Sequence, residues 1–257
     1  MLLDIRHVTR GFGGLVAVSD LSMMVTPGAI HGLIGPNGAG KSTVFNLISG
    51  VLSLSAGEIF FKGERISGLR PSEICRRGVA RTFQATTLFR EFTVLQNLLV
   101  AAHLRAADGL APALFASPAY RRKEREALAS AQENLTSLGL GGTAQAGRSV
   151  EKLPHRDQKA LSIAMALATG AELVLLDEPL AGLTAQEREE TLGALRRLRD
   201  RGLTILLVEH DMKAVMGLCD VVTVLDHGVR IAEGTPREIQ ENPAVIEAYL
   251  GAEDARA

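Results

Sequence analysis

The sequence lacks the long apolar runs that mark a membrane protein or a secreted precursor. None approaches the ~20 residues that a helix needs to cross a bilayer. The start, MLLDIRHVTR, has no basic stretch followed by an apolar run. We therefore expect a chain without a signal peptide that is soluble by itself and reaches a membrane only through a partner.

Clustered cysteines and an excess of one charge are also missing. The only cysteines, Cys75 and Cys219, lie far apart, which favours free thiols in a reducing compartment over a disulfide or a metal cluster. The net charge of −1 gives no general attraction to nucleic acid or acidic lipid. One charge run, RRKERE at 121–126, fits a solvated helix face better than a nucleic-acid surface.

Strand and helix patterns alternate along the chain, and no internal repeat is visible. Residues 1–85 are predicted to be mostly β, with short strands between glycine and proline turns. Residues 41–52, 91–107 and 120–140 are predicted to be helices, and 220–234 a hairpin. This alternation predicts an α/β fold with a parallel sheet covered on both faces.

A glycine-rich stretch between a predicted strand and a predicted helix indicates phosphate binding. GPNGAGKS fits the pattern G-x-x-x-x-G-K-[ST] in full, so a chance glycine turn is a poor alternative. Its backbone N–H groups and the helix N-terminus would face phosphate, Lys41 would reach the β- and γ-phosphates, and Ser42 would bind Mg²⁺. The predicted binding residues here are Gly35, Pro36, Asn37, Gly38, Ala39, Gly40, Lys41, Ser42 and Thr43.

A second motif, LVLLDEP, ends an apolar run in two acids. Asp177 is placed to hold Mg²⁺, directly or through water. Glu178 is placed to polarise an attacking water as a general base. The alternative is that this acidic pair caps a helix or forms a turn.

At this point the sequence resembles the ATP-binding subunit of an ABC transporter, over nearly the whole chain. Gln84 matches the glutamine that contacts Mg²⁺ and water and senses the membrane subunit, and His210 matches the switch histidine at the γ-phosphate. LAGL, Leu180 to Leu183, matches the loop at the dimer interface. Phe12 matches the aromatic that stacks on adenine, although GFGG also fits a turn with a core phenylalanine.

The resemblance implies a single ABC ATPase domain over 1–257, with ATP and Mg²⁺ as cofactors. Its P-loop (RecA-like) ATPase core would comprise 1–86 and 169–257, with an N-terminal antiparallel β subdomain. An α-helical subdomain would be inserted at 87–168. The tail, 234–257, is similar to the branched-chain amino acid type.

GVARTFQATTLFREFTVLQNLLVAAH and this tail are similar to the larger ATPase of the branched-chain amino acid uptake system. That branch also serves urea, amides and other small polar solutes. It implies an importer with a second, different ATPase, two membrane permease subunits and an external solute-binding protein. The chain would then lie on the cytoplasmic face of the inner membrane. An exporter subunit, a soluble ABC ATPase of DNA repair or translation, and a regulatory partner without activity fit the motifs less well.

The stretch LPHRDQ stands where the family has its signature loop, L-S-G-G-Q, which in the family's dimer faces the phosphate loop of the other subunit. Leu153 is kept, but Pro154 replaces the serine, and Asp157 replaces the glutamine. His155 and Arg156 replace the two glycines. We expect a retained fold with altered chemistry, unless the signature lies elsewhere. Of the two ATP sites in a dimer, the site built on this chain's own phosphate loop would hydrolyse ATP, and the other would turn over slowly.

Overall fold

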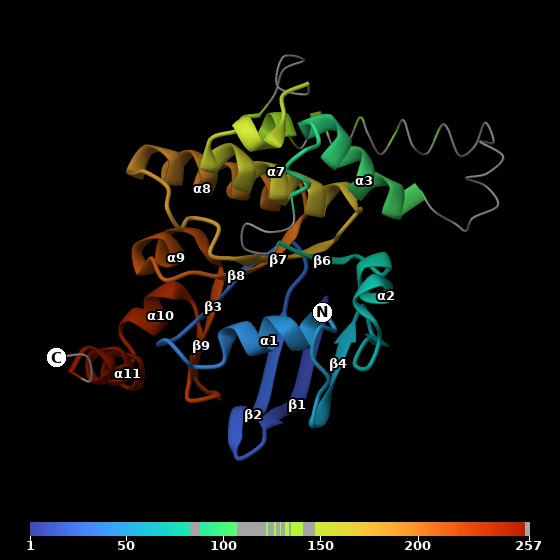
Figure 1. Ribbon diagram of the computed structural model, residues 1–257. Coiled ribbons are helices and arrows are strands. Elements are labelled where there is room, and N and C mark those ends of the chain that lie inside the picture. The colour runs from blue at the N-terminus through green and yellow to red at the C-terminus, as the bar shows by residue number, and fades with distance from the viewer. Residues whose placement is uncertain are drawn as a thin grey trace. The chain divides into compact units, whose positions relative to one another are not determined.

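The computed structural model describes residues 1–82, 88–106, 135–140 and 147–254, together with positions 122, 126, 129, 132 and 133. The chain divides into two compact units (Figure 1). The first contains Met1–Arg77 and Arg199–Ala257, and the second contains Gly78–Leu198. The predicted helical subdomain, 87–168, falls inside the second unit.

An antiparallel sheet forms the N-terminal part of the first unit. Its strands are β1 (Leu3–Phe12), β2 (Leu15–Val25), β4 (Ala56–Phe61) and β5 (Glu64–Arg65), in the order β2-β1-β4-β5. Leu3 and Ile5 of β1 are buried, as expected of alternate residues on one face of a strand. The predicted N-terminal antiparallel β part is confirmed.

A parallel arrangement forms the rest of the first unit. β3 (Ile30–Ile34) pairs in parallel with β8 (Thr204–Val208) and with β9 (Val221–Asp226), and β10 (Val229–Gly234) pairs antiparallel with β9. Every residue of β3 and β8 is buried, as expected of a parallel sheet covered on both faces. The helices of this unit are α1 (Lys41–Ile48), α2 (Pro71–Arg76), α9 (Met212–Leu218), α10 (Pro236–Gln240) and α11 (Pro243–Asp254).

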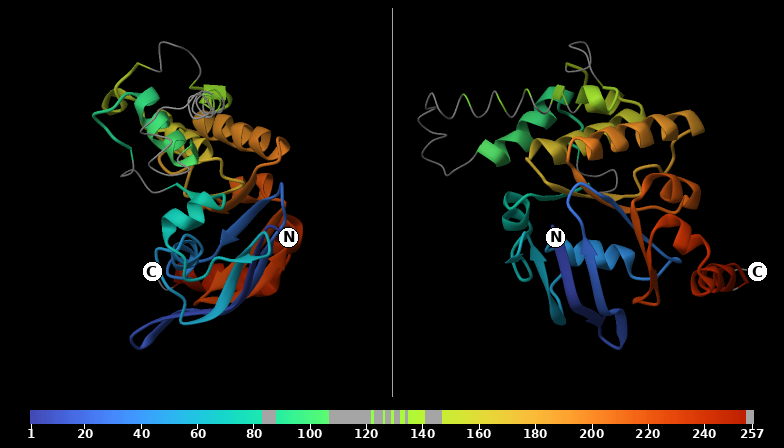
Figure 2. Two further views of the ribbon diagram at one scale, coloured as in Figure 1. Left: turned by 90° about the vertical axis from the view of Figure 1, so that its right-hand side faces the viewer. Right: turned by 180° about the vertical axis from the view of Figure 1, so that it is seen from behind.

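The second unit combines a short parallel strand pair with helices. β6 (Val79–Arg81) and β7 (Leu173–Asp177) run parallel. The helical elements are α3 (Val94–Ala106), the 3₁₀ turn η1 (Val150–Lys152), α7 (His155–Ala168) and α8 (Ala185–Asp200). The views in Figures 1 and 2 agree that α3, α7 and α8 lie side by side.

Two local predictions are confirmed. The β9–β10 hairpin turns at His227 and Gly228, whose φ values of 45° and 81° are those of a tight two-residue turn. Cys75 and Cys219 are free thiols, and burial raises the pKa of Cys219 to about 12. In the part of the chain that the structure describes, no helix is long and apolar enough to cross a bilayer.

Other local predictions need correction. The mostly β start contains α2, a short helix that begins with a proline, and Glu73 Oε2 accepts a hydrogen bond from the backbone N–H of Arg70 at 2.9 Å. The helix expected over 41–52 ends at Ile48, because Gly50 has a φ of 72° and terminates it. The helix expected over 120–140 lies mostly outside the described residues.

Candidate functional site

The loop from Gly35 to Gly40 joins the end of β3 to the start of α1, and both glycines are required there. Their φ values are 149° and 100°. A Cβ on Gly35 would lie 2.0 Å from the carbonyl oxygen of Leu225, and one on Gly40 would lie 2.4 Å from that of Ala17. No residue with a side chain fits either position, so the glycines of the motif have a direct structural cause.

The N-terminus of α1 is suited to an anion. Gly40 is its N-cap, and no described side chain caps it by a hydrogen bond. The first N–H groups of a helix have no partner within the helix, and the helix dipole adds positive potential there. Ser42 is exposed and Thr43 half-buried at this end. A phosphate group can therefore reach the first turn of the helix from solvent.

Lys41 is folded back over the loop. Lys41 is only 6 % exposed. Its Nζ donates to the carbonyl oxygens of Gly35 at 2.8 Å and Pro36 at 2.9 Å. A buried ammonium group is unfavourable without hydrogen-bond acceptors, and these carbonyls provide two. The arrangement holds a positive charge within the loop, as the predicted phosphate contact requires.

The hairpin between β9 and β10 braces the loop from outside. The backbone N–H of Gly228 donates to the carbonyl of Ala39 at 3.1 Å, and the N–H of Ser19 donates to the carbonyl of Gly228 at 2.8 Å. The loop therefore keeps its shape through backbone bonds to segments far away in the sequence.

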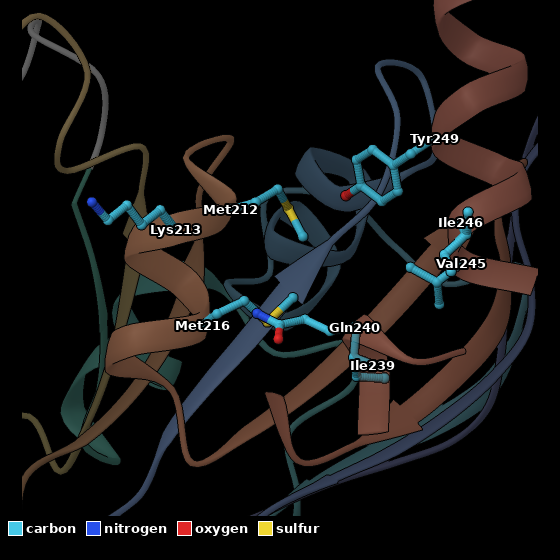
Figure 3. Close-up of a pocket in the computed structure, with 8 residues that line it drawn as sticks. All are labelled: Met212, Lys213, Met216, Ile239, Gln240, Val245, Ile246 and Tyr249. Atoms are coloured by element: carbon cyan, nitrogen blue, oxygen red, sulfur yellow. The ribbon is translucent and has the colours of Figure 1, made fainter. Parts of the chain in front are cut away.

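The C-terminal tail also contacts the loop, through Tyr249 of α11. Burial raises the pKa of Tyr249 to about 12, and a backbone hydrogen bond from Gly35 opposes that rise. Tyr249 lines a pocket of about 370 Å³. The other lining residues, from α9, α10 and α11, are Met212, Lys213, Met216, Ile239, Gln240, Val245 and Ile246 (Figure 3).

Asp177 and Glu178 lie where β7 ends, in the second unit. Glu178 has a φ of 48°, which is uncommon for a residue with a side chain and costs ~1–3 kcal/mol. Lys159 of α7 donates from Nζ to the carbonyl oxygens of Glu178 at 2.8 Å and Pro179 at 3.2 Å. These bonds hold the strained turn. Arg81 forms an ion pair with Asp177.

The acidic pair does not cap a helix. The next helix, α8, begins only at Ala185. Its start has its own cap, since Glu187 accepts hydrogen bonds from the N–H and hydroxyl of Thr184 at 2.8 and 2.9 Å. The helix-cap alternative for Asp177 and Glu178 is therefore wrong.

The remaining predicted residues differ in how they are placed. His210 is exposed just after β8, and its backbone N–H donates to Glu209 Oε2 at 3.1 Å. Phe12 is 43 % exposed, and the Arg10 guanidinium stacks on its ring at 4.6 Å. Phe12 is thus at a hairpin end and not in the core, which removes that alternative. Gln84 lies outside the described residues.

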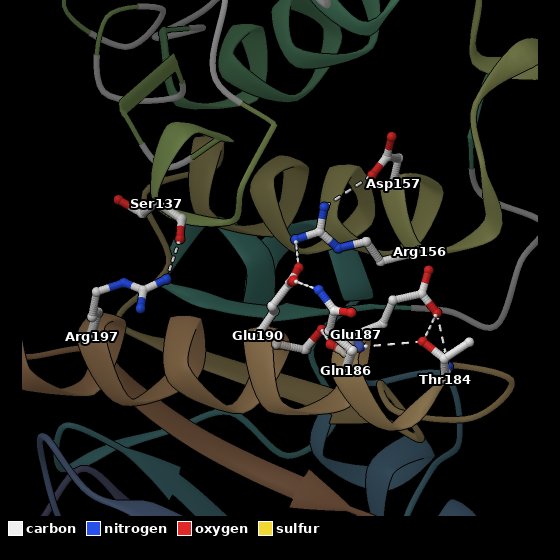
Figure 4. Close-up of polar contacts among 9 residues, drawn as sticks. Ser137, Arg156, Asp157, Thr184, Gln186, Glu187, Glu190 and Arg197 are labelled. Carbon is white, nitrogen blue, oxygen red and sulfur yellow. Dashed lines mark hydrogen bonds and ion pairs between the residues drawn. The ribbon is translucent and has the colours of Figure 1, made fainter.

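The stretch LPHRDQ forms the start of α7. Leu153 is buried, Pro154 is the N-cap, and His155 is the first helical residue. Arg156 bonds Asp157 Oδ1 at 3.3 Å and Glu190 Oε2 of α8 at 3.0 Å, as Figure 4 shows. The altered signature therefore starts a regular helix, and its arginine joins two helices of the same unit.

His155 packs against the LAGL segment. A Cβ on Gly182, whose φ is 74°, would lie 3.3 Å from Cε1 of His155. Two stretches that the sequence assigned to the dimer interface, LPHRD and Leu180 to Leu183, are thus neighbours in the second unit. The third predicted interface element, the phosphate loop, belongs to the first unit.

The donor set fits Mg²⁺. This ion prefers hard oxygen ligands and, in nucleotide sites, takes one or two from the protein and the rest from phosphate and water. Ser42 in the first unit and Asp177 in the second unit each carry an oxygen donor of this kind. Both lie at element ends, Ser42 at the start of α1 and Asp177 at the end of β7.

The model of the ABC transporter family matches residues 18–181, which is more than half of the chain. The chain belongs to the ABC transporter family. A second model, the branched-chain amino acid ATP-binding cassette transporter, matches the end of this ABC protein, residues 229–255.

Individual relatives agree. The cassette is 44 % identical over 251 residues to the high-affinity branched-chain amino acid transport ATP-binding protein LivG of Escherichia coli, covering 97 % of this chain and 98 % of LivG. It is 42 % identical to BraF of Pseudomonas aeruginosa with the same coverage. A crystal structure of an ABC transporter cassette in its ADP conformation aligns with a TM-score of 0.83 at 30 % identity. The alignment covers 97 % of this chain and 98 % of that one.

These similarities confirm the predicted fold and class. The cassette has the α/β P-loop ATPase fold and is an ATP-binding ATPase subunit of an ABC transporter. The sequence prediction overlooked three residues that contact predicted site residues: Arg81 and Lys159 in the second unit, and Tyr249 in the first. Each contacts a motif residue that is distant in sequence. Of the three, only Arg81 lies within a stretch that the sequence comparison with the family used, RTFQ.

Proposed function

We propose that this chain binds and hydrolyses ATP to energise the import of branched-chain or related amino acids. The observation that carries the ATP part is the glycine loop closed around buried Lys41. The solute class is supported by the match of the tail, 229–255, and by the names of the relatives.

In this proposal the phosphate loop binds the nucleotide. Backbone N–H groups of the loop and of the first turn of α1 hold the phosphates together with the ammonium of Lys41. Phe12 stacks on the adenine, which is worth ~1–3 kcal/mol by analogy with base stacking in nucleic-acid complexes. The exposed ring of Phe12, with its stacked Arg10, supports this role.

Hydrolysis is assigned to residues that follow β7 and β8. Glu178 takes a proton from the attacking water, and His210 contacts the γ-phosphate. Ser42, Asp177 and Gln84 would hold Mg²⁺, which would neutralise negative charge on the phosphates of the nucleotide. The strained backbone of Glu178, held by Lys159, supports a functional role, because such strain concentrates at active sites.

The partner ATPase is proposed to be a different chain with an intact signature. This chain offers Pro154 where a hydroxyl is needed, and Arg156 is engaged with Asp157 and Glu190. A homodimer would carry this altered loop at both ATP sites. We therefore assign hydrolysis to the site with this chain's Glu178 and slow turnover to the other.

The transporter would also contain two membrane permease subunits, with an external solute-binding protein delivering the solute. The cassette would sit on the cytoplasmic face of the inner membrane through the permeases. Phe89 and Phe92, which follow Gln84 in the chain, stack with ring centroids 5.3 Å apart and are 47 % and 39 % exposed. Such an exposed aromatic pair supports a protein contact here.

The test is Glu178→Gln in the assembled transporter. We expect ATP hydrolysis and uptake of labelled leucine to fall by about 100-fold or more, because the general base is lost. Glu189→Gln, which changes an exposed glutamate of α8, is the matched control and should leave both unchanged.

Survival of half of the ATPase activity in Glu178→Gln would overturn the assignment of hydrolysis to this chain's site. Full ATPase activity in the wild type with uptake of urea or an amide, and none of leucine, would instead overturn only the solute class.

A further inference from the structure

Arg81 and Asp177 form a buried ion pair at the ends of two neighbouring strands. The parallel strands β6 and β7 end at these residues. Nη2 of Arg81 lies 3.0 Å from Oδ2 of Asp177, and the side chains are only 8 % and 9 % exposed. Arg81 thus engages one oxygen of the carboxylate that is proposed to hold Mg²⁺.

This pair has two opposing physical effects. A carboxylate buried to this extent needs a neighbouring cation, because an isolated buried charge is strongly unfavourable. Arg81 provides that cation. A Mg²⁺ ion that approaches the same carboxylate meets the positive charge of Arg81, so the two cations compete for Asp177.

We infer that Arg81 is a positioning residue that holds the Asp177 carboxylate and raises the Mg²⁺ concentration needed for nucleotide binding. The inference rests on the proposed role of Asp177 as a Mg²⁺ ligand. The location supports it, since ligands of open α/β sheets bind at the carboxyl ends of parallel strands, where both residues lie.

A structural ion pair and a competing cation differ in what happens when Arg81 is replaced. In both cases Asp177 loses its partner and the protein becomes less stable. Only competition also makes Mg²⁺ bind more tightly, because the ion no longer shares the carboxylate with a guanidinium group. Stability and Mg²⁺ affinity therefore move in opposite directions.

The test is Arg81→Met in the full chain, which removes the charge and keeps most of the side-chain length. We expect the Mg²⁺ concentration for half-maximal binding of a fluorescent ATP analogue to fall about fivefold. The melting temperature without nucleotide should fall as well. Arg81→Lys keeps a charge but loses the planar fork of the guanidinium, so its Mg²⁺ midpoint should lie between those of Arg81→Met and the wild type.

Two further variants make the outcome specific. Arg197→Met removes another arginine of the same unit, one whose Nη2 donates to the carbonyl of Ser137 at 2.9 Å (Figure 4). It should leave the Mg²⁺ midpoint unchanged. Asp177→Asn should strongly weaken the Mg²⁺ dependence.

An unchanged or higher Mg²⁺ midpoint in folded Arg81→Met overturns the inference, and Arg81→Lys decides if the Met variant does not fold. If Asp177→Asn keeps the full Mg²⁺ dependence, the proposed ligand itself is wrong. If Asp177→Asn loses that dependence and Arg81→Met keeps the wild-type midpoint, only the competition is wrong.

Discussion

His31 illustrates how one buried side chain determines a property of the protein. It lies in β3 and is 1 % exposed. Its Nε2 is 2.7 Å from the Thr223 hydroxyl, which donates to Glu233 Oε2 at 2.8 Å. Because that hydroxyl gives its single hydrogen to Glu233, it accepts from His31, which therefore carries a proton on Nε2. Burial lowers its pKa to about 4, although the charge of Glu233 acts in the opposite direction.

This lowered pKa predicts a loss of stability in acid. The unfolded chain takes up the His31 proton below about pH 6.5 and the folded chain only near pH 4. Unfolding thus binds a proton in this window, and the free energy of unfolding should fall by up to ~3 kcal/mol as pH drops through it. Denaturant unfolding at several pH values measures this.

The variant that tests this is His31→Gln, which should show a smaller fall between pH 6.5 and 4. An equal fall in His31→Gln and the wild type would contradict the prediction.

At the scale of elements, α7 explains how the altered signature is compatible with folding. Pro154, at the N-cap, lacks a backbone N–H. This costs no hydrogen bond within the helix, because N–H groups at a helix start have no partner there. Asp157 in the first turn suits the helix dipole. Arg156 then connects α7 to α8 through Glu190. The stretch therefore keeps residues that suit the start of a helix, although it lacks the hydroxyl and the glycines of the family signature.

Arg156→Ala tests whether this arginine is structural. Because its ion pairs are partly exposed, the free energy of unfolding should fall by only about 1 kcal/mol. ATP hydrolysis in the assembled transporter should stay within about twofold of wild type. Glu190→Gln should give a similar loss of stability. A severe fall in hydrolysis with normal stability would instead make LPHRD a working signature.

At the scale of the whole molecule, the proposed asymmetry predicts the composition of the complex. The tagged chain, purified from gently solubilised membranes of its own cells, should bring down two membrane proteins and a second ATPase with an intact signature. Mass spectrometry identifies them. Membrane proteins with this ATPase alone would contradict the slow second site, and soluble partners alone would contradict transport.

The sequence by itself determined the features whose chemistry is local. The phosphate loop could be predicted because its glycines, Lys41 and Ser42 follow one another at fixed offsets between a strand and a helix. The β9–β10 hairpin could be predicted from its turn residues. The short helix α2 could not, because it depends on its cap and not on a long periodic pattern.

Only the tertiary structure decided which side chains support the motifs. Arg81 and Asp177 are 96 residues apart and meet because β6 and β7 pair in parallel. Tyr249 reaches Gly35 because α11 packs in the same unit as the loop. Such contacts depend on strand order and helix packing, which bring distant residues together, and no spacing within the sequence encodes them.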